Sequence, residues 1–160
     1  MDKSQLRTSL LAALQTEFDN LVRAAHMARE EATSEESRAE NKYDTRGQEA
    51  AYLAEGQARL AAELQETLAL YQSLPLPDFS AAAQAEIGAV VTLQSPRGSP
   101  ALYFLGPRSG GLEFDCAGAR VIVVTPQSPL GRQLLGRRVG ETVQLPSRSG
   151  PSPHRVTALT

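Results

Sequence analysis

Residues 30–40 read Glu-Glu-Ala-Thr-Ser-Glu-Glu-Ser-Arg-Ala-Glu, with no hydrophobic side chain larger than alanine. A segment this polar must lie in solvent. Within it, Ser37 is followed three residues later by Glu40, the spacing of a capping box. In that motif the serine oxygen accepts from the backbone N–H of the glutamate, whose carboxylate reaches back. A helix is therefore predicted to begin near Ser37.

The residues before this polar segment have the pattern of a long amphipathic helix. From Ser4 to about Thr33 there is no proline or glycine, and apolar residues recur every three or four positions. They are Leu6, Leu10, Leu14, Leu21, Ala25 and Ala28. Such a helix would be about 45 Å long, longer than a chain of this size needs for its own packing. It requires a second helix as a partner.

The residues after the polar segment supply that partner, from about Arg38 to Gln72. Apolar side chains again follow helical spacing: Tyr52, Leu53, Leu60, Leu64, Leu68 and Tyr71. Two long helices joined by a short polar turn make an antiparallel hairpin. Gly56 lies inside the second helix, where glycine costs about 1 kcal/mol relative to alanine. It indicates either a close approach of two helices or a tolerated glycine.

Two prolines in the segment Ser-Leu-Pro-Leu-Pro-Asp at 73–78 end the hairpin, because proline stops a helix and favours extended chain. We therefore place the hairpin at 1–74, a linker at 75–79 and a second domain at 80–160. In that domain apolar residues alternate in short segments between glycine-rich turns, which predicts strands. The strands include 89–93, 101–105, 121–125 and 142–145.

One short helix is predicted inside the second domain. Ser128 is a suitable N-cap, Pro129 takes the first helical position, residues 130–135 form the body and Gly136 ends it. The fold class is therefore α+β. It combines an N-terminal antiparallel coiled-coil hairpin, which carries an acidic tip, with a C-terminal antiparallel sheet and one short helix.

Charge is distributed unevenly along the chain. Residues 1–78 carry fourteen acids and eight bases, whereas residues 79–160 carry four acids and eight bases. This polarity indicates two modules with different contacts and disfavours binding to duplex nucleic acid through its phosphates. The single cysteine, Cys116, excludes an internal disulfide and a cysteine-based metal site, and we interpret it as a small buried residue. Without a signal peptide pattern or an apolar run of about 20 residues, we expect a cytoplasmic protein with no membrane partner.

Two stretches of the sequence resemble the GreA/GreB family of bacterial transcript-cleavage factors. In the hairpin, Glu40-Asn41 is followed, fifteen residues after that glutamate, by Glu55-Gly56. The second domain carries Ser128-Pro129-Leu130-Gly131-Arg132, then Leu134-Leu135-Gly136-Arg137 and Val139-Gly140-Glu141. The resemblance spans nearly the whole chain. It implies a hairpin that enters the secondary channel of RNA polymerase and an FKBP-like domain that docks at the channel rim.

The resemblance implies an accessory factor of RNA polymerase rather than an enzyme. The polymerase active site would cleave backtracked RNA, while carboxylates at the hairpin tip help to hold its second Mg²⁺ and to position water. Mg²⁺ prefers oxygen ligands and keeps several waters, so one or two such carboxylates suffice. The protein would need no cofactor of its own, would be a monomer, and would bring its tip near the 3′ end of the nascent RNA. The acids expected to act on the metal are Glu40, Glu36 and Glu35, supported by Ser37, Asn41, Arg38, Lys42 and Asp44.

The tip departs from the family pattern at one position. The family has an Asp followed three residues later by Glu and then Asn, whereas here Ser37 occupies the Asp position. Serine can cap a helix but brings no charge to a metal. Two activities stay open: stimulation of RNA cleavage, with Glu35 or Glu36 replacing the missing Asp, and modulation or inhibition of the polymerase without cleavage. The structural alternative for these acids is a solvated turn, in which each charge near a helix N-terminus contributes about 0.3 to 1 kcal/mol.

Basic residues form two further groups. Arg38, Lys42 and Arg46 alternate with the tip acids, either to contact the polymerase channel or RNA phosphates, or simply to pair within the helix. The short helix of the second domain has a cluster of arginines, which suggests a surface that docks on the polymerase rim. Its residues are Ser128, Pro129, Leu130, Arg132, Gly136, Arg137 and Arg138.

Two functions of other classes compete with this interpretation. An FKBP-like fold also suggests a prolyl isomerase or chaperone, but an isomerase pocket is lined with aromatic residues. The second domain offers only Tyr103, Phe104 and Phe114, with Phe79 at the end of the linker, which argues against isomerase activity. A purely structural coiled coil, which would not bind polymerase, is the other alternative.

Overall fold

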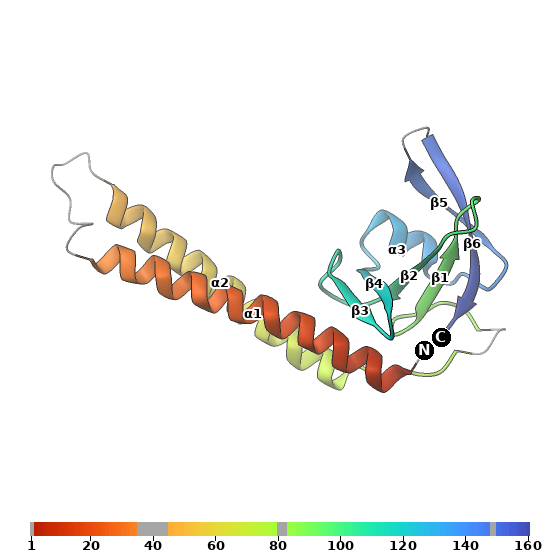
Figure 1. Cartoon of the computed structure of the whole chain (residues 1–160), viewed down its shortest axis with the longest axis horizontal. Helices are drawn as coiled ribbons and strands as arrows, with labels where there is room; N and C mark the ends of the chain where they lie inside the picture. The colour runs from red at the N-terminus through yellow and green to blue at the C-terminus, as the bar shows by residue number, and fades with distance from the viewer. Residues whose placement is uncertain (1, 35–44, 80–82, 148–149) are drawn as a thin grey trace. The chain divides into compact units, whose positions relative to one another are not determined.

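The computed structural model describes residues 2–34, 45–79, 83–147 and 150–160. In chain order the elements are α1 (Lys3–Thr33), α2 (Arg46–Ser73), β1 (Val90–Gln94), β2 (Pro100–Leu105), β3 (Glu113–Cys116), β4 (Ala119–Val124), α3 (Pro129–Leu134), β5 (Thr142–Ser147) and β6 (Gly150–Leu159), as Figure 1 shows. The predicted α+β fold class, two long helices followed by a sheet with one short helix, is confirmed. No described helix is both long enough and apolar enough to cross a membrane.

The chain divides into two compact units. One is Leu11–Gln72, and the other combines Met1–Leu10 with Ser73–Thr160. The first turns of α1 are thus grouped with the sheet, whereas the sequence placed all of residues 1–74 in the hairpin. Within the sheet unit, Leu6 is buried and the Lys3 ammonium donates to the carbonyl of Gly88 at 2.9 Å.

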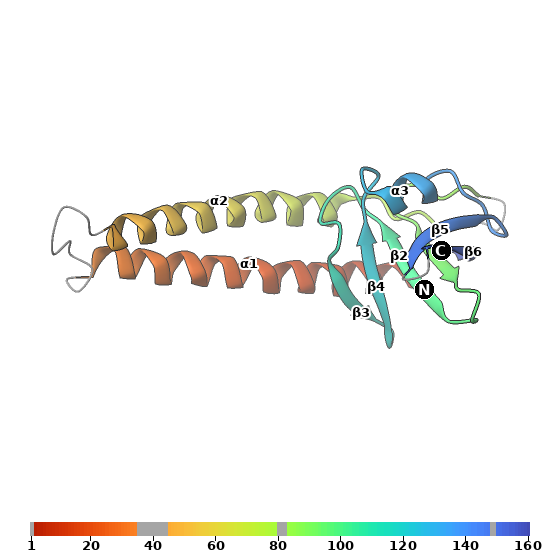
Figure 2. The ribbon, with the colours of Figure 1, turned by 90° about the horizontal axis from the view of Figure 1, so that it is seen from above.

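The helices of the hairpin unit run side by side in opposite directions (Figures 1 and 2). Buried side chains of α2 fall at alternating three- and four-residue steps, as a coiled-coil seam requires; they include Ala50, Ala61, Leu64, Leu68 and Tyr71. The side chains of Tyr52, Leu53 and Leu60 are instead 68, 54 and 44% exposed. The expectation that these three side chains face the first helix is therefore wrong. At their level of the hairpin, the seam is formed by alanines.

The second helix begins later than predicted. Thr45 is not helical, and α2 starts at Arg46 rather than near Arg38. The Thr45 carbonyl accepts from the Glu49 N–H at 2.9 Å and its hydroxyl donates to the Glu49 carboxylate at 2.8 Å, which helps to close the first helical turn. The proposed capping pair, Ser37 with Glu40, lies outside the described residues.

Gly56 is a tolerated glycine rather than a site of close helix approach. A Cβ atom built on it would meet no heavy atom of the described structure within 4 Å. Of the two interpretations of this residue, the structure therefore supports the second.

The six strands form one sheet in the order β3-β4-β2-β1-β6-β5. Four neighbouring pairs are antiparallel, but β2 and β4 are parallel, with Leu102 opposite Val121 and Leu105 opposite Val124. This corrects the expectation of a wholly antiparallel sheet. The chain leaves β2, runs back as the edge strand β3 and returns as β4 between the two, so that β4 has the direction of β2.

The main core of the sheet unit lies on the face that α3 covers. Leu134 of α3 packs in a buried cluster with residues from five strands and from the segment before β1: Ala85, Ala89, Val91, Leu93, Leu105, Val124, Val143, Val156 and Leu159. On alternate positions of the central strands, Val90, Phe104, Val121 and Val123 are also buried. The central strands are therefore apolar on both faces, as expected of strands that are covered on both sides. Cys116 is free and buried, as predicted.

Two strands, β3 and β6, were not among the segments predicted. The last strand contains Pro151 and Pro153, which cannot donate to a sheet ladder and make the segment resemble a loop. In the structure β1 pairs with β6 only between Arg155 and Leu159. The prolines therefore lie where β6 has a neighbour only on the β5 side, and the missing N–H groups are tolerated there.

Candidate docking site around the short helix

The predicted site has two parts, and the structure describes one of them. The tip residues lie outside the described residues: Glu35, Glu36, Ser37, Arg38, Glu40, Asn41, Lys42 and Asp44. Their roles stay predictions. The docking residues at α3 and just after it all lie within the described part of the chain.

The N-terminus of α3 is built as the sequence predicts. Ser128 has an extended backbone (φ −72°, ψ 153°), and its hydroxyl oxygen accepts from the Gly131 N–H at 3.0 Å. The same hydroxyl donates to the Thr125 carbonyl at 2.8 Å. Pro129 follows in the first turn, where its fixed φ suits the helix and its missing N–H costs nothing. Ser128 therefore both caps α3 and ties it to the end of β4.

Gly131 allows α3 to approach the chain that follows β4. A Cβ atom at this position would lie 1.9 Å from the Thr125 carbonyl oxygen and 3.0 Å from the Ser128 hydroxyl oxygen. Both neighbours are held in place, since the Thr125 carbonyl is backbone and the Ser128 hydroxyl is the helix cap. In the sequence, Gly131 stands out only as part of the resemblance. A glycine inside a helix is the signal that could have revealed this close approach.

Gln133 anchors the helix to the sheet, a role that was not predicted from the sequence. Its amide oxygen accepts from the Gln144 N–H at 2.8 Å, and its amide nitrogen donates to the Gln144 carbonyl at 3.0 Å. The side chain thus satisfies both backbone groups of one β5 residue. Leu134, the next residue, is fully buried, and Leu130 packs against the core. Together these contacts fix the position of α3 on the sheet.

The chain after α3 is pinned by backbone hydrogen bonds. Gly136 has a φ of +76°, which glycine adopts without strain, and its N–H donates to the Ala85 carbonyl at 2.8 Å. The Arg137 carbonyl accepts from the Ala85 N–H at 2.8 Å. The helix ends before Gly136, as predicted, and this segment cannot move independently of residue 85.

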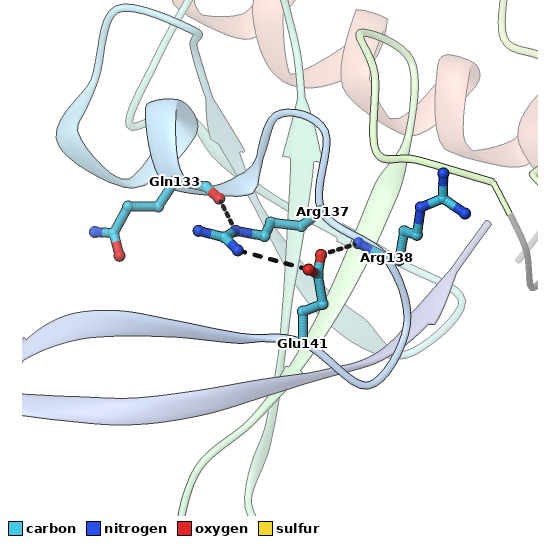
Figure 3. Close-up of polar contacts among 4 residues, drawn as sticks. All are labelled: Gln133, Arg137, Arg138 and Glu141. Atoms are coloured by element: carbon cyan, nitrogen blue, oxygen red, sulfur yellow. Dashed lines mark hydrogen bonds and ion pairs between the residues drawn. The ribbon is translucent and has the colours of Figure 1, made fainter.

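Arg137 and Glu141 point toward one another in the turn that follows (Figure 3). The Arg137 Nε donates to the Gln133 carbonyl at 3.0 Å, and its Nη1 lies 3.7 Å from Glu141 Oε1. The other carboxylate oxygen accepts from the Arg138 N–H at 2.7 Å. Both side chains of the ion pair are over 40% exposed. They are therefore oriented by the fold yet still accessible to a partner.

The exposed side chains of this segment suit binding to a protein. Arg132 and Arg138 are exposed cations, and Leu135 and Val139 are each 37% exposed. Arginines beside apolar side chains are enriched in protein interfaces. Among the described residues, no group of three or more His, Cys, Asp or Glu side chains could hold a metal ion. The structure places all seven predicted docking residues on one short stretch, and their contact with a partner stays a prediction.

Comparison with known proteins gives structural likenesses only. No protein-family model and no curated protein matches the sequence. The chain is similar in structure to GreA factor homolog 1 (Gfh1) of Thermus thermophilus, at 22% identity over 94% of each chain with a TM-score of 0.40. It is also similar to Thermus aquaticus Gfh1, at 25% identity over 94% of this chain and 90% of that one with a TM-score of 0.39. A third likeness is to the transcription elongation factor GreA/GreB from Nitrosomonas europaea, at 17% identity over 62% and 78% with a TM-score of 0.40. Because these TM-scores lie below 0.5, the functional proposal rests on the chain's own residues.

Proposed function

We propose that this chain is a Gre-like transcription elongation factor that acts on RNA polymerase in the bacterial cytoplasm. The observation that carries the proposal is the segment Ser128–Glu141. Its sequence resembles that of the Gre factors, and in this fold it forms an exposed, basic and rigidly held surface. The order of the modules, a long hairpin followed by a mixed sheet with one short helix, agrees with the same family.

Docking through this segment is supported by its rigidity. Ser128, Gly131 and Gln133 fix the helix, and Glu141 orients the chain after it. A surface that is already ordered loses less conformational entropy when it binds, so more of the contact energy appears as affinity. Its positive charge would speed association with an acidic surface of the polymerase.

The finer part of the proposal is that the hairpin tip stimulates cleavage of backtracked RNA by the polymerase. Glu40 would supply one carboxylate to the Mg²⁺ site of the polymerase, and Glu35 or Glu36 would take the place of the Asp that Ser37 replaces. The metal, when bound there, would activate water and stabilise the charge that develops on the cleaved phosphate. The protein contributes only ligands and needs no metal of its own.

The experiment is RNA cleavage in a reconstituted backtracked polymerase complex. We expect the wild-type chain to accelerate cleavage in the presence of Mg²⁺, and Glu40→Ala and the Glu35→Ala/Glu36→Ala double variant to lose that acceleration. Glu49→Ala, which removes an acid from the first turn of α2, is the control and should retain activity. A Glu40→Ala variant that accelerates cleavage as much as the wild-type chain would contradict the proposed role of the tip.

A second candidate function is supported by Ser37. A tip that lacks the family's Asp could occupy the secondary channel and modulate or inhibit the polymerase without stimulating cleavage. In that case the wild-type chain should bind polymerase and alter RNA synthesis but leave the cleavage rate unchanged, and Ser37→Asp should restore cleavage. Failure of Ser37→Asp to do so would show that the missing Asp does not decide the activity.

A further inference from the structure

The core face of the sheet opens into a polar hollow at one end. His154 lies two residues before the buried Val156 on β6 and opposite the buried Val143 of β5. It therefore shares the core face with both residues, because side chains alternate along a strand. Beyond them, polar side chains join apolar ones such as Leu145 around a hollow. The hollow has a volume of about 480 Å³, and its lining includes Ser95, Pro96, Arg97, Pro146, Ser152 and His154.

Arg97 stands on a tight turn at the rim of this hollow. The Gly98 N–H donates to the Ser95 carbonyl at 2.9 Å, which closes a four-residue turn with Pro96 at its second position, where the fixed φ of proline is preferred. The Ser95 hydroxyl oxygen accepts from the Ser99 N–H at 3.1 Å, which leaves its own hydrogen as a donor. The turn thus presents one guanidinium and one hydroxyl from a constrained backbone.

His154 lines the hollow from β6. Its Nδ1 lies 3.0 Å from the Ser152 carbonyl oxygen, and because a carbonyl can only accept, Nδ1 carries a proton and donates. This bond restrains the half-buried ring and leaves Nε2 as its second polar atom.

The composition of the lining selects the ligand. Among the described residues around the hollow there is an arginine, a histidine and three serines, but no Asp or Glu. The Ser147 hydroxyl already donates to the Gly150 carbonyl at 2.6 Å, so the donors for a ligand are the Arg97 guanidinium and the hydroxyls of Ser95 and Ser152. Donors without a carboxylate beside them suit an anion, and the guanidinium fork matches the oxygens of a phosphate. Pro96 and Pro146, with Leu145, supply the apolar part of the lining, here called the proline wall. The volume lies within the range of small-ligand sites, so the group that carries the phosphate can be accommodated as well.

We propose that this hollow binds the phosphate group of a nucleotide, with the sugar or base against the proline wall. The same chemistry could come from a free mononucleotide or from one nucleotide of a single-stranded RNA. The proposal does not depend on the proposed function, because binding is measured on the full chain without polymerase.

The test is a titration of the full chain, followed by amide chemical shifts, with adenosine monophosphate, inorganic phosphate, adenosine and a short oligoadenylate. We expect saturable shifts with adenosine monophosphate, centred on residues 95–98 and 152–154. Adenosine lacks the phosphate, so its affinity should be lower by about tenfold or more. Arg97→Ala should weaken adenosine monophosphate binding by about tenfold. His154→Asn is the second variant and should weaken it as well. Arg120→Ala removes an exposed arginine of the sheet unit that pairs with Glu113, and this control should leave binding unchanged.

The outcomes separate the two sources and decide the proposal. Oligoadenylate binding more tightly than the mononucleotide supports an RNA strand, and equal affinity supports a free nucleotide. Adenosine binding as tightly as its monophosphate would overturn the proposal, as would an Arg97→Ala variant of native fold with unchanged affinity. Shifts that do not saturate with any of the phosphate probes would overturn it too.

Discussion

Glu141 accepts the backbone N–H of Arg138 with one carboxylate oxygen, at 2.7 Å, and faces the Arg137 guanidinium with the other, at 3.7 Å (Figure 3). One side chain therefore contacts two of the three arginines proposed to dock on the polymerase, the guanidinium of Arg137 and the backbone of Arg138. An ion pair this exposed adds at most about 1 kcal/mol to stability. Its main effect is to hold the turn between α3 and β5 in one conformation.

Replacing Glu141 with alanine should weaken binding to RNA polymerase more than it weakens the fold. The Arg137 side chain would keep only its bond to the Gln133 carbonyl, and the N–H of Arg138 would lose its acceptor. We expect the free energy of unfolding to fall by about 1 kcal/mol and polymerase affinity to fall by severalfold. Urea unfolding and a polymerase-binding titration measure the two quantities.

Glu113→Ala is the matched control for this prediction. Glu113 forms an exposed ion pair with Arg120 at 3.4 Å, but between the edge strand β3 and its neighbour β4 rather than beside α3. It should leave polymerase affinity unchanged. Equal losses of affinity in the two variants would contradict a specific role of the turn after α3 in binding.

Adding a single methyl group at Gly131 should destabilise the sheet unit. The new Cβ atom would sit 1.9 Å from the Thr125 carbonyl oxygen, so either α3 or the end of β4 must shift. We expect Gly131→Ala to lower the free energy of unfolding by about 2 to 3 kcal/mol, measured by urea denaturation.

Gly56→Ala is the matched control, and we expect it not to lower stability. Its Cβ would enter open space on α2, and alanine favours a helix over glycine by about 1 kcal/mol. Stability should therefore rise or stay the same. A Gly131→Ala variant as stable as wild type would show that α3 does not require a glycine at this contact.

The sequence predicted those elements whose signals are local. Ser128, Pro129 and Gly136 mark the ends of α3 through cap chemistry alone, and the structure confirms all three roles. The close approach at Gly131 and the bond from Gln133 to Gln144 could not be predicted, because each depends on how α3 packs against strands that the sequence predicts but does not place in space. The parallel pairing of β2 with β4 was missed because β3 was not predicted.

Alkaline pH should destabilise the protein through Tyr103. Partial burial raises the pKa of its hydroxyl above the ordinary value of 10.0, because the charged form is poorly solvated there. The unfolded chain therefore releases this proton first as the pH rises. The stabilisation is fully present below pH 10 and is lost as the pH rises from about 10 through the folded-state pKa.

Urea unfolding at pH 9 and at pH 11 checks this prediction, with Tyr103→Phe as the comparison. Phenylalanine keeps the ring but has no proton to release. We expect the wild type to lose more stability than Tyr103→Phe between the two pH values. Equal losses would exclude Tyr103 as the titrating group.

Two leucines four residues apart on α2 test where the seam of the hairpin lies. Leu64 is 8% exposed and Leu60 is 44% exposed, although both fit the helical spacing read from the sequence. Truncating a buried leucine removes apolar burial and leaves a cavity, so Leu64→Ala should lower the free energy of unfolding by about 2 to 3 kcal/mol. Leu60→Ala should cost less than about 1 kcal/mol, since most of what it removes already contacts water. Thermal or urea unfolding, followed by the helical circular dichroism signal, measures both variants. If Leu60→Ala lowered the free energy of unfolding more than Leu64→Ala, the seam would lie on the face expected from the leucine spacing. That result would contradict the alanine-lined contact that the structure shows.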